Sequence, residues 1–176
     1  MSNQSKVVFY GAISLDGYLA RENHALDWLF GTEGEEETGY QEFYDSVGTI
    51  LMGRNTYDQI SILSPDRFPY EGKPCYVFSR TMQDHTEHVT FVNEDIVGFT
   101  QSLKKQEGKR IWMVGGGEVL QQLLQEKVVD EFIIQIAPAI IGRGIPLFVE
   151  GDQENELTLV DVRRYKQFAE LHYHVK

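Results

Sequence analysis

The sequence predicts an α/β fold built on a mostly parallel sheet with an antiparallel C-terminal edge. Eight short runs rich in apolar, β-branched and aromatic residues resemble strands, and helical patterns lie between them. Several runs are almost entirely apolar, which is typical of strands covered on both faces. The last two alternate more closely on either side of Arg164–Gln167, which favours an antiparallel hairpin. A chain of 176 residues is long enough for one domain, 1–176.

The elements are predicted from residue type and spacing, in chain order. β-branched and aromatic runs predict the strands Val7–Ile13, Thr49–Met52, Cys75–Phe78, Val89–Val92, Ile111–Val114, Glu131–Ala137, Leu157–Val162 and Phe168–Val175. Apolar residues three or four positions apart predict the helices Thr38–Val47, Glu94–Gln106 and Glu118–Lys127, with a short helix over Asn55–Ile62. Polar loops connect these elements, among them Ser14–Ala25 and Gly142–Pro146.

Charge and cysteine content exclude several classes of protein. The formal net charge is −11, from 16 Lys and Arg against 27 Asp and Glu, which argues against a nucleic acid or an anionic membrane as partner. Cys75 is the only cysteine, so no internal disulfide can form, as expected in a reducing compartment. The N-terminal residues lack the pattern of a signal peptide, and no apolar run approaches membrane-spanning length. These features predict a cytoplasmic protein.

Three consecutive glycines, Gly115, Gly116 and Gly117, separate a predicted strand from a predicted helix in RIWMVGGGEVLQQLL. Glycine loses much backbone entropy on folding, so the repeat indicates a need for bare main chain. Backbone N–H groups at such a turn, together with the helix N-terminus, form an anion site. The turn lacks the Lys and Ser or Thr of a P-loop and the third spaced glycine of a Rossmann fingerprint. A phosphate site of another class and a tight turn without ligand both remain possible.

Two further strand ends carry groups suited to phosphate. In TILMGRNTY, Gly53 permits a turn and Arg54 opens a helix, where its charge opposes the helix dipole unless it serves an anion. In CYVFSRT, Ser79 and Arg80 follow a strand with a hydroxyl and a guanidinium, which suit a phosphate monoester. Each arginine alone could be an ordinary surface residue. Three such strand ends together predict a ligand site at the carboxyl edge of the sheet.

The chain resembles the dihydrofolate-reductase-like superfamily in the order of five motifs. These are SLDGYLA (Ser14–Ala20), MGRNTY (Met52–Tyr57), FSRT (Phe78–Thr81), VGGGEVL (Val114–Leu120) and VDEFIIQIAPAIIGRGIPLF (Val129–Phe148). More closely, the chain is similar to the C-terminal reductase domain of the bifunctional riboflavin-biosynthesis protein RibD and its stand-alone relatives. The resemblance implies a three-layer α/β/α fold with an eight-stranded sheet, an oxidoreductase that uses NADPH for hydride transfer, and a homodimer formed through the C-terminal region.

The resemblance also implies that NADPH lies along the three strand ends. The triple-glycine turn would wrap its pyrophosphate, and the family often has a cis peptide between the first two glycines. Contacts to the adenosine 2′-phosphate would give a preference for NADP over NAD. The implied cofactor residues are Ala12 and Ile13 at the nicotinamide, Gly53, Arg54, Asn55 and Thr56 at the pyrophosphate and adenosine side, Ser79 and Arg80 at the 2′-phosphate, and Val114, Gly115, Gly116, Gly117, Glu118 and Val119 around the pyrophosphate.

The dihydrofolate reductases carry a carboxylate that contacts the pterin, and this sequence offers no unambiguous match. Asp27 beside Trp28 is one catalytic candidate, because an aromatic wall would raise its pKa toward the proton-donor range; a helix cap is the alternative. Asp16 is the other, with a turn-forming role before Gly17 as its alternative. Ser14–Ala20 would be a mobile loop with Gly17 as its hinge. The acidic residues near the first predicted helix are Glu37, Glu42 and Asp45.

The sequence therefore predicts an NADPH-dependent reductase of a small pteridine- or pyrimidine-like heterocycle, related to the 5-amino-6-(5-phosphoribosylamino)uracil reductase of riboflavin biosynthesis. The zinc deaminase signature of the bifunctional protein is absent, and one cysteine could not supply it. The alternatives are a non-catalytic NADP(H)-binding dimer and a weak dihydrofolate reductase. No metal site is predicted, because His85 and His88 fall in a polar loop while His172 and His174 suit a solvated strand edge.

Overall fold

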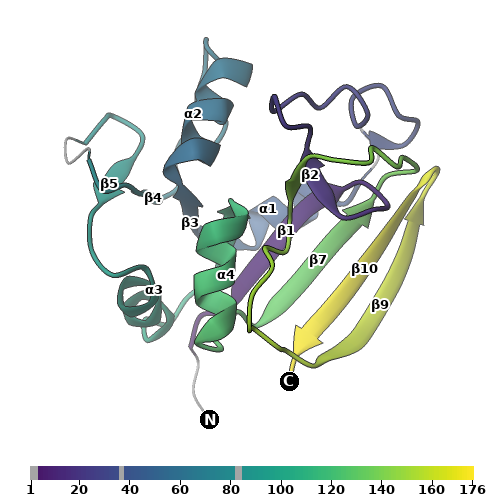
Figure 1. The fold of residues 1–176 in the computed structure, drawn as a ribbon. Coiled ribbons are helices and arrows are strands. Elements are labelled where there is room, and N and C mark those ends of the chain that lie inside the picture. The colour runs from purple at the N-terminus through teal and green to yellow at the C-terminus, as the bar shows by residue number, and fades with distance from the viewer. Residues whose placement is uncertain (1–3, 36–37, 82–84) are drawn as a thin grey trace.

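The computed structural model describes residues 4–35, 38–81 and 85–176, so the acidic candidate Glu37 lies outside the described residues. An eight-stranded sheet forms the centre of the fold (Figure 1). In spatial order the strands are β5 (Thr90–Val92), β4 (Cys75–Phe78), β3 (Val47–Gly53), β6 (Arg110–Gly115), β1 (Val7–Ile13), β7 (Glu131–Ile136), β10 (Phe168–Val175) and β9 (Leu157–Tyr165).

The direction of the strands agrees with the sequence pattern. Neighbouring strands from β5 to β7 are parallel, whereas β10 is antiparallel to both β7 and β9. The turn between β9 and β10 contains Lys166, which has a positive φ of 53°. The predicted α/β fold with a mostly parallel sheet and an antiparallel C-terminal edge is confirmed.

In the described ranges, four α-helices cover the two faces of the sheet. α1 (Tyr40–Asp45) and α2 (Arg54–Leu63) pack on one face, and α3 (Ile96–Lys104) and α4 (Gly117–Gln125) pack on the other. The resulting arrangement is a helix layer, a sheet layer and a helix layer (Figure 1). None of the helices in the described part of the chain has the length and apolar character needed to cross a bilayer.

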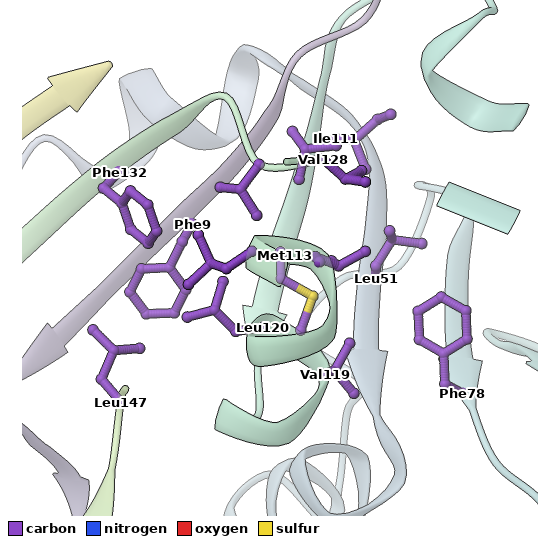
Figure 2. Packing of buried hydrophobic residues seen from close by; sticks show 14 of the residues in the cluster. Phe9, Leu51, Phe78, Ile111, Met113, Val119, Leu120, Val128, Phe132 and Leu147 are labelled. Atoms are coloured by element: carbon purple, nitrogen blue, oxygen red, sulfur yellow. The ribbon is translucent and has the colours of Figure 1, made fainter. Parts of the chain in front are cut away.

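The larger core lies between the sheet and α3 and α4. Leu120 of α4 is 1% exposed and packs in the same cluster as Phe9 of β1 and Met113 of β6 (Figure 2). The Phe9 ring also lies 6.1 Å from the ring of Phe132 on β7. Because α4 directly follows the triple-glycine turn, burial of its apolar face fixes the position of that turn against the sheet.

Several element bounds differ by a few residues from the predicted ones, and two differences change the architecture. The first helix ends at Asp45 instead of Val47, because Val47 pairs with Arg110 and begins β3. Two short strands, β2 (Tyr18–Ala20) and β8 (Ile145–Pro146), pair antiparallel inside segments predicted to be loops. Strands of two or three residues carry no readable alternation, and a contact between distant segments creates them.

Candidate cofactor site

The predicted strand ends lie side by side at the carboxyl edge of the sheet. Gly53, the last residue of β3, pairs with Phe78, the last residue of β4. Gly115, the last residue of β6, pairs with the residue before Gly53. A Cβ atom on Gly53 would lie 3.6 Å from the backbone nitrogen of Gly116, so the two glycine turns are in contact. The register of the sheet therefore brings MGRNTY, FSRT and VGGGEVL together.

Helices α2 and α4 begin at this edge without a side-chain cap. Their N-cap residues are Gly53 and Gly116, which have no side chain to accept from the first-turn N–H groups. In contrast, Asp95 caps α3 and accepts a hydrogen bond from the Gly98 nitrogen at 2.8 Å. The first N–H groups of a helix have no intrahelical partner and carry the positive end of its dipole. Two such ends in contact have the chemistry that an anion site requires.

Arg54 and Ser79 meet at the same edge. Arg54 Nη1 lies 3.5 Å from Ser79 Oγ, and Ser79 is 8% exposed. The Arg54 guanidinium forms an ion pair with Asp58, whose Oδ1 lies 2.9 Å from Arg54 Nε. Arg54 Cζ lies 5.7 Å from the centroid of the Phe91 ring. Asp58 thus offsets part of the unfavourable placement of Arg54 at a helix start. Arg80 is exposed beside Ser79.

The glycine turn has the expected cis peptide between Gly115 and Gly116. Gly115 has a φ of 155°, a conformation that residues with a Cβ rarely adopt. A Cβ on Gly117 would lie 2.9 Å from the carbonyl oxygen of Pro146 and 3.1 Å from that of Leu147. The packing of this protein therefore requires Gly117 to be glycine whether or not a ligand is bound.

The other predicted cofactor residues lie around this edge with different exposure. Ala12 and Ile13 end β1, where they pair with Gln135 and Ile136 of β7. Thr56 Oγ1 is close to the glycine turn, at 3.3 Å from where a Cβ on Gly115 would lie. The exposure of the predicted residues varies. Asn55 and Glu118 are exposed, Val114 and Ala12 are half-buried, and Ile13 and Val119 are buried.

Asp27 is not in the environment that the sequence suggested. Its carboxylate is 64% exposed and forms a two-point ion pair with Arg21, with Nε–Oδ1 at 2.7 Å and Nη2–Oδ2 at 3.1 Å. Trp28 instead packs inward against Phe168 and Ala137. The sequence predicted a raised pKa for Asp27, and this is wrong, because the hydrogen bonds from Arg21 lower that pKa. A proton-donor role for Asp27 stays a prediction that these contacts do not favour.

Asp16 joins two loops. Its carboxylate accepts hydrogen bonds from the backbone nitrogens of Ile141, at 3.2 Å, and Gly142, at 2.8 Å, and from Ser14 Oγ at 2.6 Å. The hydrogen bond from Ser14, followed by those from the backbone, lowers the pKa of Asp16. The contact adds to the β2–β8 pairing that ties segment Ser14–Ala20 to the 139–147 segment. Gly17, the predicted hinge, has a φ of 92°.

We predict that Asp16→Asn destabilises the protein more at neutral pH than in acid. The pKa of Asp16 is lower in the folded chain than its ordinary value of about 3.9. The carboxylate therefore contributes stability above about pH 4 and loses it as the pH falls through the folded pKa. Urea unfolding at pH 7 and pH 3 should show a gap in the free energy of unfolding between wild type and variant that is smaller at pH 3 than at pH 7. Asp152→Asn, at another exposed site, is the control, and an equal gap at both pH values contradicts the prediction.

The sequence reasoning missed a buried polar cluster that joins Tyr10 of β1, Gln135 of β7 and Glu170 of β10. Gln135 donates from Nε2 to Tyr10 Oη at 2.7 Å and to Glu170 Oε2 at 2.9 Å. Burial raises the pKa of Tyr10 to about 12, and Glu170 is only 7% exposed. Tyr10 and Glu170 line a groove together with Phe43 of α1. Alternation along β10 was the available signal, but it does not show that Glu170 points inward.

The acidic residues on α1 do not match a buried carboxylate. Glu42 and Asp45 are both exposed, and Asp45 accepts a hydrogen bond from Gln41 at 2.9 Å. Among the described residues, the carboxylates shielded from solvent are those of Glu131 and Glu170, on β7 and β10.

The comparisons with known proteins agree with this geometry. Residues 5–169 match the family model of the RibD C-terminal domain. The chain is 43% identical to the uncharacterized protein YwjB of Bacillus subtilis (strain 168) over 171 residues, which cover 97% of this chain and 98% of YwjB.

Two solved structures share the fold over nearly their whole length. A putative riboflavin biosynthesis protein from Shewanella sp. PV-4 has a TM-score of 0.85 and 30% identity, covering 97% of this chain and 99% of that one. Dihydrofolate reductase from Enterococcus faecalis, complexed with NADP(H), has a TM-score of 0.68 and 16% identity, covering 98% of each chain. The second likeness shows a common fold alone.

Proposed function

Because the chain belongs to the RibD C-terminal domain family, we propose that it is an NADPH-dependent reductase. The observation that carries the proposal is the meeting of two uncapped helix N-termini with Arg54 and Ser79 at one sheet edge. A dinucleotide needs this combination, because its pyrophosphate suits bare backbone donors and its 2′-phosphate suits a guanidinium and a hydroxyl.

The residues present fit this cofactor. Gly53 and Gly116 leave the first-turn N–H groups of α2 and α4 accessible to the pyrophosphate. Arg54, Ser79 and Arg80 would hold the 2′-phosphate side, and Ala12 and Ile13 would face the nicotinamide. When bound, NADPH supplies a hydride; the chain supplies orientation and excludes water. Asp16 and Asp27 have lowered pKa values, so we assign them to holding loops and not to proton donation.

The substrate that we propose is a small pteridine- or pyrimidine-like heterocycle. The Shewanella relative is described as a putative riboflavin biosynthesis protein, which supports a reaction related to that of 5-amino-6-(5-phosphoribosylamino)uracil reductase. A homodimer and a cytoplasmic location are parts of the same proposal. Exposed apolar residues on β9 support the dimer: Leu157, Leu159, Val160 and Val162. The buried free thiol of Cys75 is compatible with a reducing compartment.

The test is a titration of the purified protein with NADPH and with NADH, followed by cofactor fluorescence and thermal shift. We expect tighter binding of NADPH, because only NADPH carries the 2′-phosphate. A Ser79→Ala/Arg80→Ala double variant should lose at least about 10-fold in affinity for NADPH and little for NADH, since hydrogen bonds to charged groups are worth about 1.5–3 kcal/mol.

Arg67→Ala is the matched control for loss of a surface arginine, since the Arg67 side chain is 81% exposed in another loop. Equal losses for the two cofactors in the double variant would overturn the 2′-phosphate assignment. Absence of binding of either cofactor to the wild type would overturn the reductase itself.

A non-catalytic NADP(H)-binding protein is the second candidate. It is favoured by one observation, that both predicted catalytic aspartates are exposed and hold ion-pair or hydrogen-bond partners. Adding pterins, dihydrofolate or riboflavin precursors to the NADPH complex separates the two functions. Oxidation of the bound cofactor supports the reductase, and stable binding without oxidation supports the second candidate.

A further inference from the structure

Three side chains of types that can ligate a metal converge on one face of the paired strands β7 and β10, away from the strand ends at the cofactor site. They are Glu131 at the start of β7 and His172 and His174 on β10. The antiparallel register pairs Glu131 with His174, and His172 lies two residues along the same strand. Alternate residues of a strand share a face, so both imidazoles lie on the side of the sheet that carries Glu131.

Two of the three side chains, those of Glu131 and His172, are less exposed than side chains on a solvated strand edge. The side chain of Glu131 is 11% exposed and that of His172 is 22% exposed, while His174 is exposed. The sequence prediction of a solvated edge is therefore wrong for His172. The ligand atoms of all three residues lie within 4.8 Å of one another.

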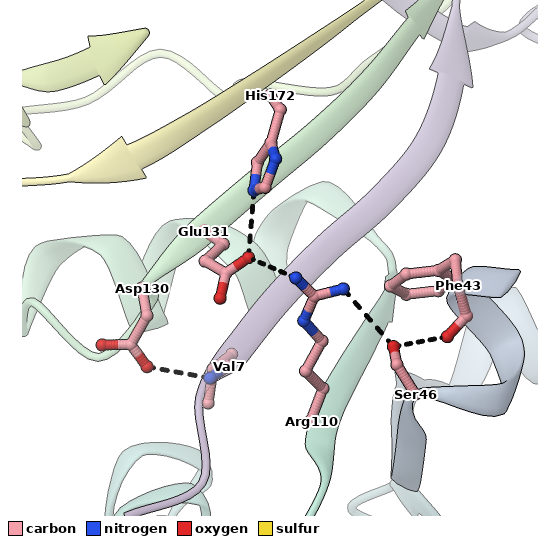
Figure 3. A network of polar contacts seen from close by, with 7 residues as sticks. All are labelled: Val7, Phe43, Ser46, Arg110, Asp130, Glu131 and His172. Atoms are coloured by element: carbon pink, nitrogen blue, oxygen red, sulfur yellow. Dashed lines mark hydrogen bonds and ion pairs between the residues drawn. The ribbon is translucent and has the colours of Figure 1, made fainter. Parts of the chain in front are cut away.

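The separation of Glu131 and His172 fits two ligands of one metal ion. His172 Nε2 lies 3.1 Å from Glu131 Oε2 (Figure 3). Two ligand atoms bound to Zn²⁺ at about 2.0–2.1 Å with a near-tetrahedral angle lie about 3.3 Å apart. An ion could therefore replace the proton between these atoms with little movement. His174 is exposed, so its ring can rotate to complete the set.

Arg110 holds Glu131 in place for this role. Arg110 Nη2 donates to Glu131 Oε2 at 3.0 Å, and Arg110 Nη1 lies 3.3 Å from Ser46 Oγ (Figure 3). The contacts of Glu131 with Arg110 and His172 both use Oε2, and among the residues that the structure describes no side-chain hydrogen bond reaches Oε1. Arg110 thus fixes the carboxylate with Oε2 beside His172 Nε2, the pair of atoms whose separation fits an ion. Such outer partners orient the ligands of protein metal sites.

We propose that Glu131, His172 and His174 form a binding site for a divalent transition-metal ion of the Zn²⁺ type. Two imidazoles and one carboxylate suit Zn²⁺ and neighbouring ions and leave a coordination position open to solvent. That position would face the groove lined by Phe43, Ser46 and Arg110. The ion would join β7 to β10, and its binding is independent of the cofactor proposal.

The test uses chelator-treated full-length protein titrated calorimetrically with Zn²⁺, and with Co²⁺ followed by visible absorption. We expect one Zn²⁺ per chain, a higher melting temperature with Zn²⁺, and a Co²⁺ spectrum typical of four or five ligands. His174→Ala and His172→Ala should each weaken binding by at least about 10- to 100-fold, the loss caused even when an outer partner is removed.

Two controls keep the outcome interpretable. His85→Ala removes an exposed imidazole elsewhere and should bind Zn²⁺ as the wild type does. His174 is itself exposed, so His174→Ala should fold even if His172→Ala does not; far-ultraviolet circular dichroism checks this. No one-to-one binding by the wild type, or unchanged binding by His174→Ala, would overturn the site.

Discussion

Replacing Leu120 by alanine should lower the free energy of unfolding by about 2–5 kcal/mol. Leu120 is 1% exposed and lies in the cluster between α4 and the central strands, close to Met113 and Phe9 (Figure 2). Truncation removes buried methyl groups and leaves a cavity that neighbouring side chains cannot fill completely. Chemical denaturation followed by circular dichroism measures the change.

Gln122→Ala is the matched control for the Leu120 variant. Gln122 is exposed on the same helix, so the substitution should change stability by no more than about 0.5 kcal/mol. A loss of similar size in both variants would contradict the burial argument, because alanine has the highest helix propensity and only the burial of the side chain distinguishes the two positions. Because α4 begins at the glycine turn, the Leu120 variant should also weaken NADPH binding, if the turn binds NADPH as we propose.

Strong local patterns made most of the sheet predictable. β1 and β10 begin and end at the predicted residues, as does β4 at Cys75–Phe78. These strands are bounded by turn residues, and their apolar content reflects burial on one or both faces. β2 and β8 were not predictable, because they exist only where Tyr18–Ala20 meets Ile145–Pro146. That contact joins segments far apart in the sequence, which no local pattern records.

The candidate site was predictable where it depends on backbone and not where it depends on side-chain direction. Glycines after strands mark Gly53 and Gly115 without knowledge of the fold, and the register confirms that these ends meet. The environment of Asp27 depended on whether its carboxylate turned to Trp28 or to Arg21, and the sequence does not decide this. The same is true of Glu131 and His172, whose contact joins two strands.

Gly117→Ala should destabilise the protein by about 1–3 kcal/mol, the usual cost of overpacking. The new Cβ would lie 2.9 Å from the carbonyl oxygen of Pro146, 3.1 Å from that of Leu147 and 3.1 Å from Val149 Cγ2. Two of these neighbours are backbone atoms, so relief requires a shift of the chain and not a side-chain rotation. Thermal and urea unfolding of the variant measure the loss, and wild-type stability would contradict the prediction.

Gly116→Ala is the informative comparison, because its Cβ meets a different neighbour. It would lie 3.5 Å from Thr56 Oγ1, an ordinary contact, and the residue has a φ of −90°, which alanine adopts. We therefore expect a smaller loss of stability than in Gly117→Ala. If the turn wraps a pyrophosphate, the added methyl group should nevertheless weaken NADPH binding. If Gly116→Ala keeps its stability but loses NADPH binding, the role of Gly116 is to let the ligand approach the main chain. If the variant still binds NADPH, the role of the glycine repeat is to allow packing.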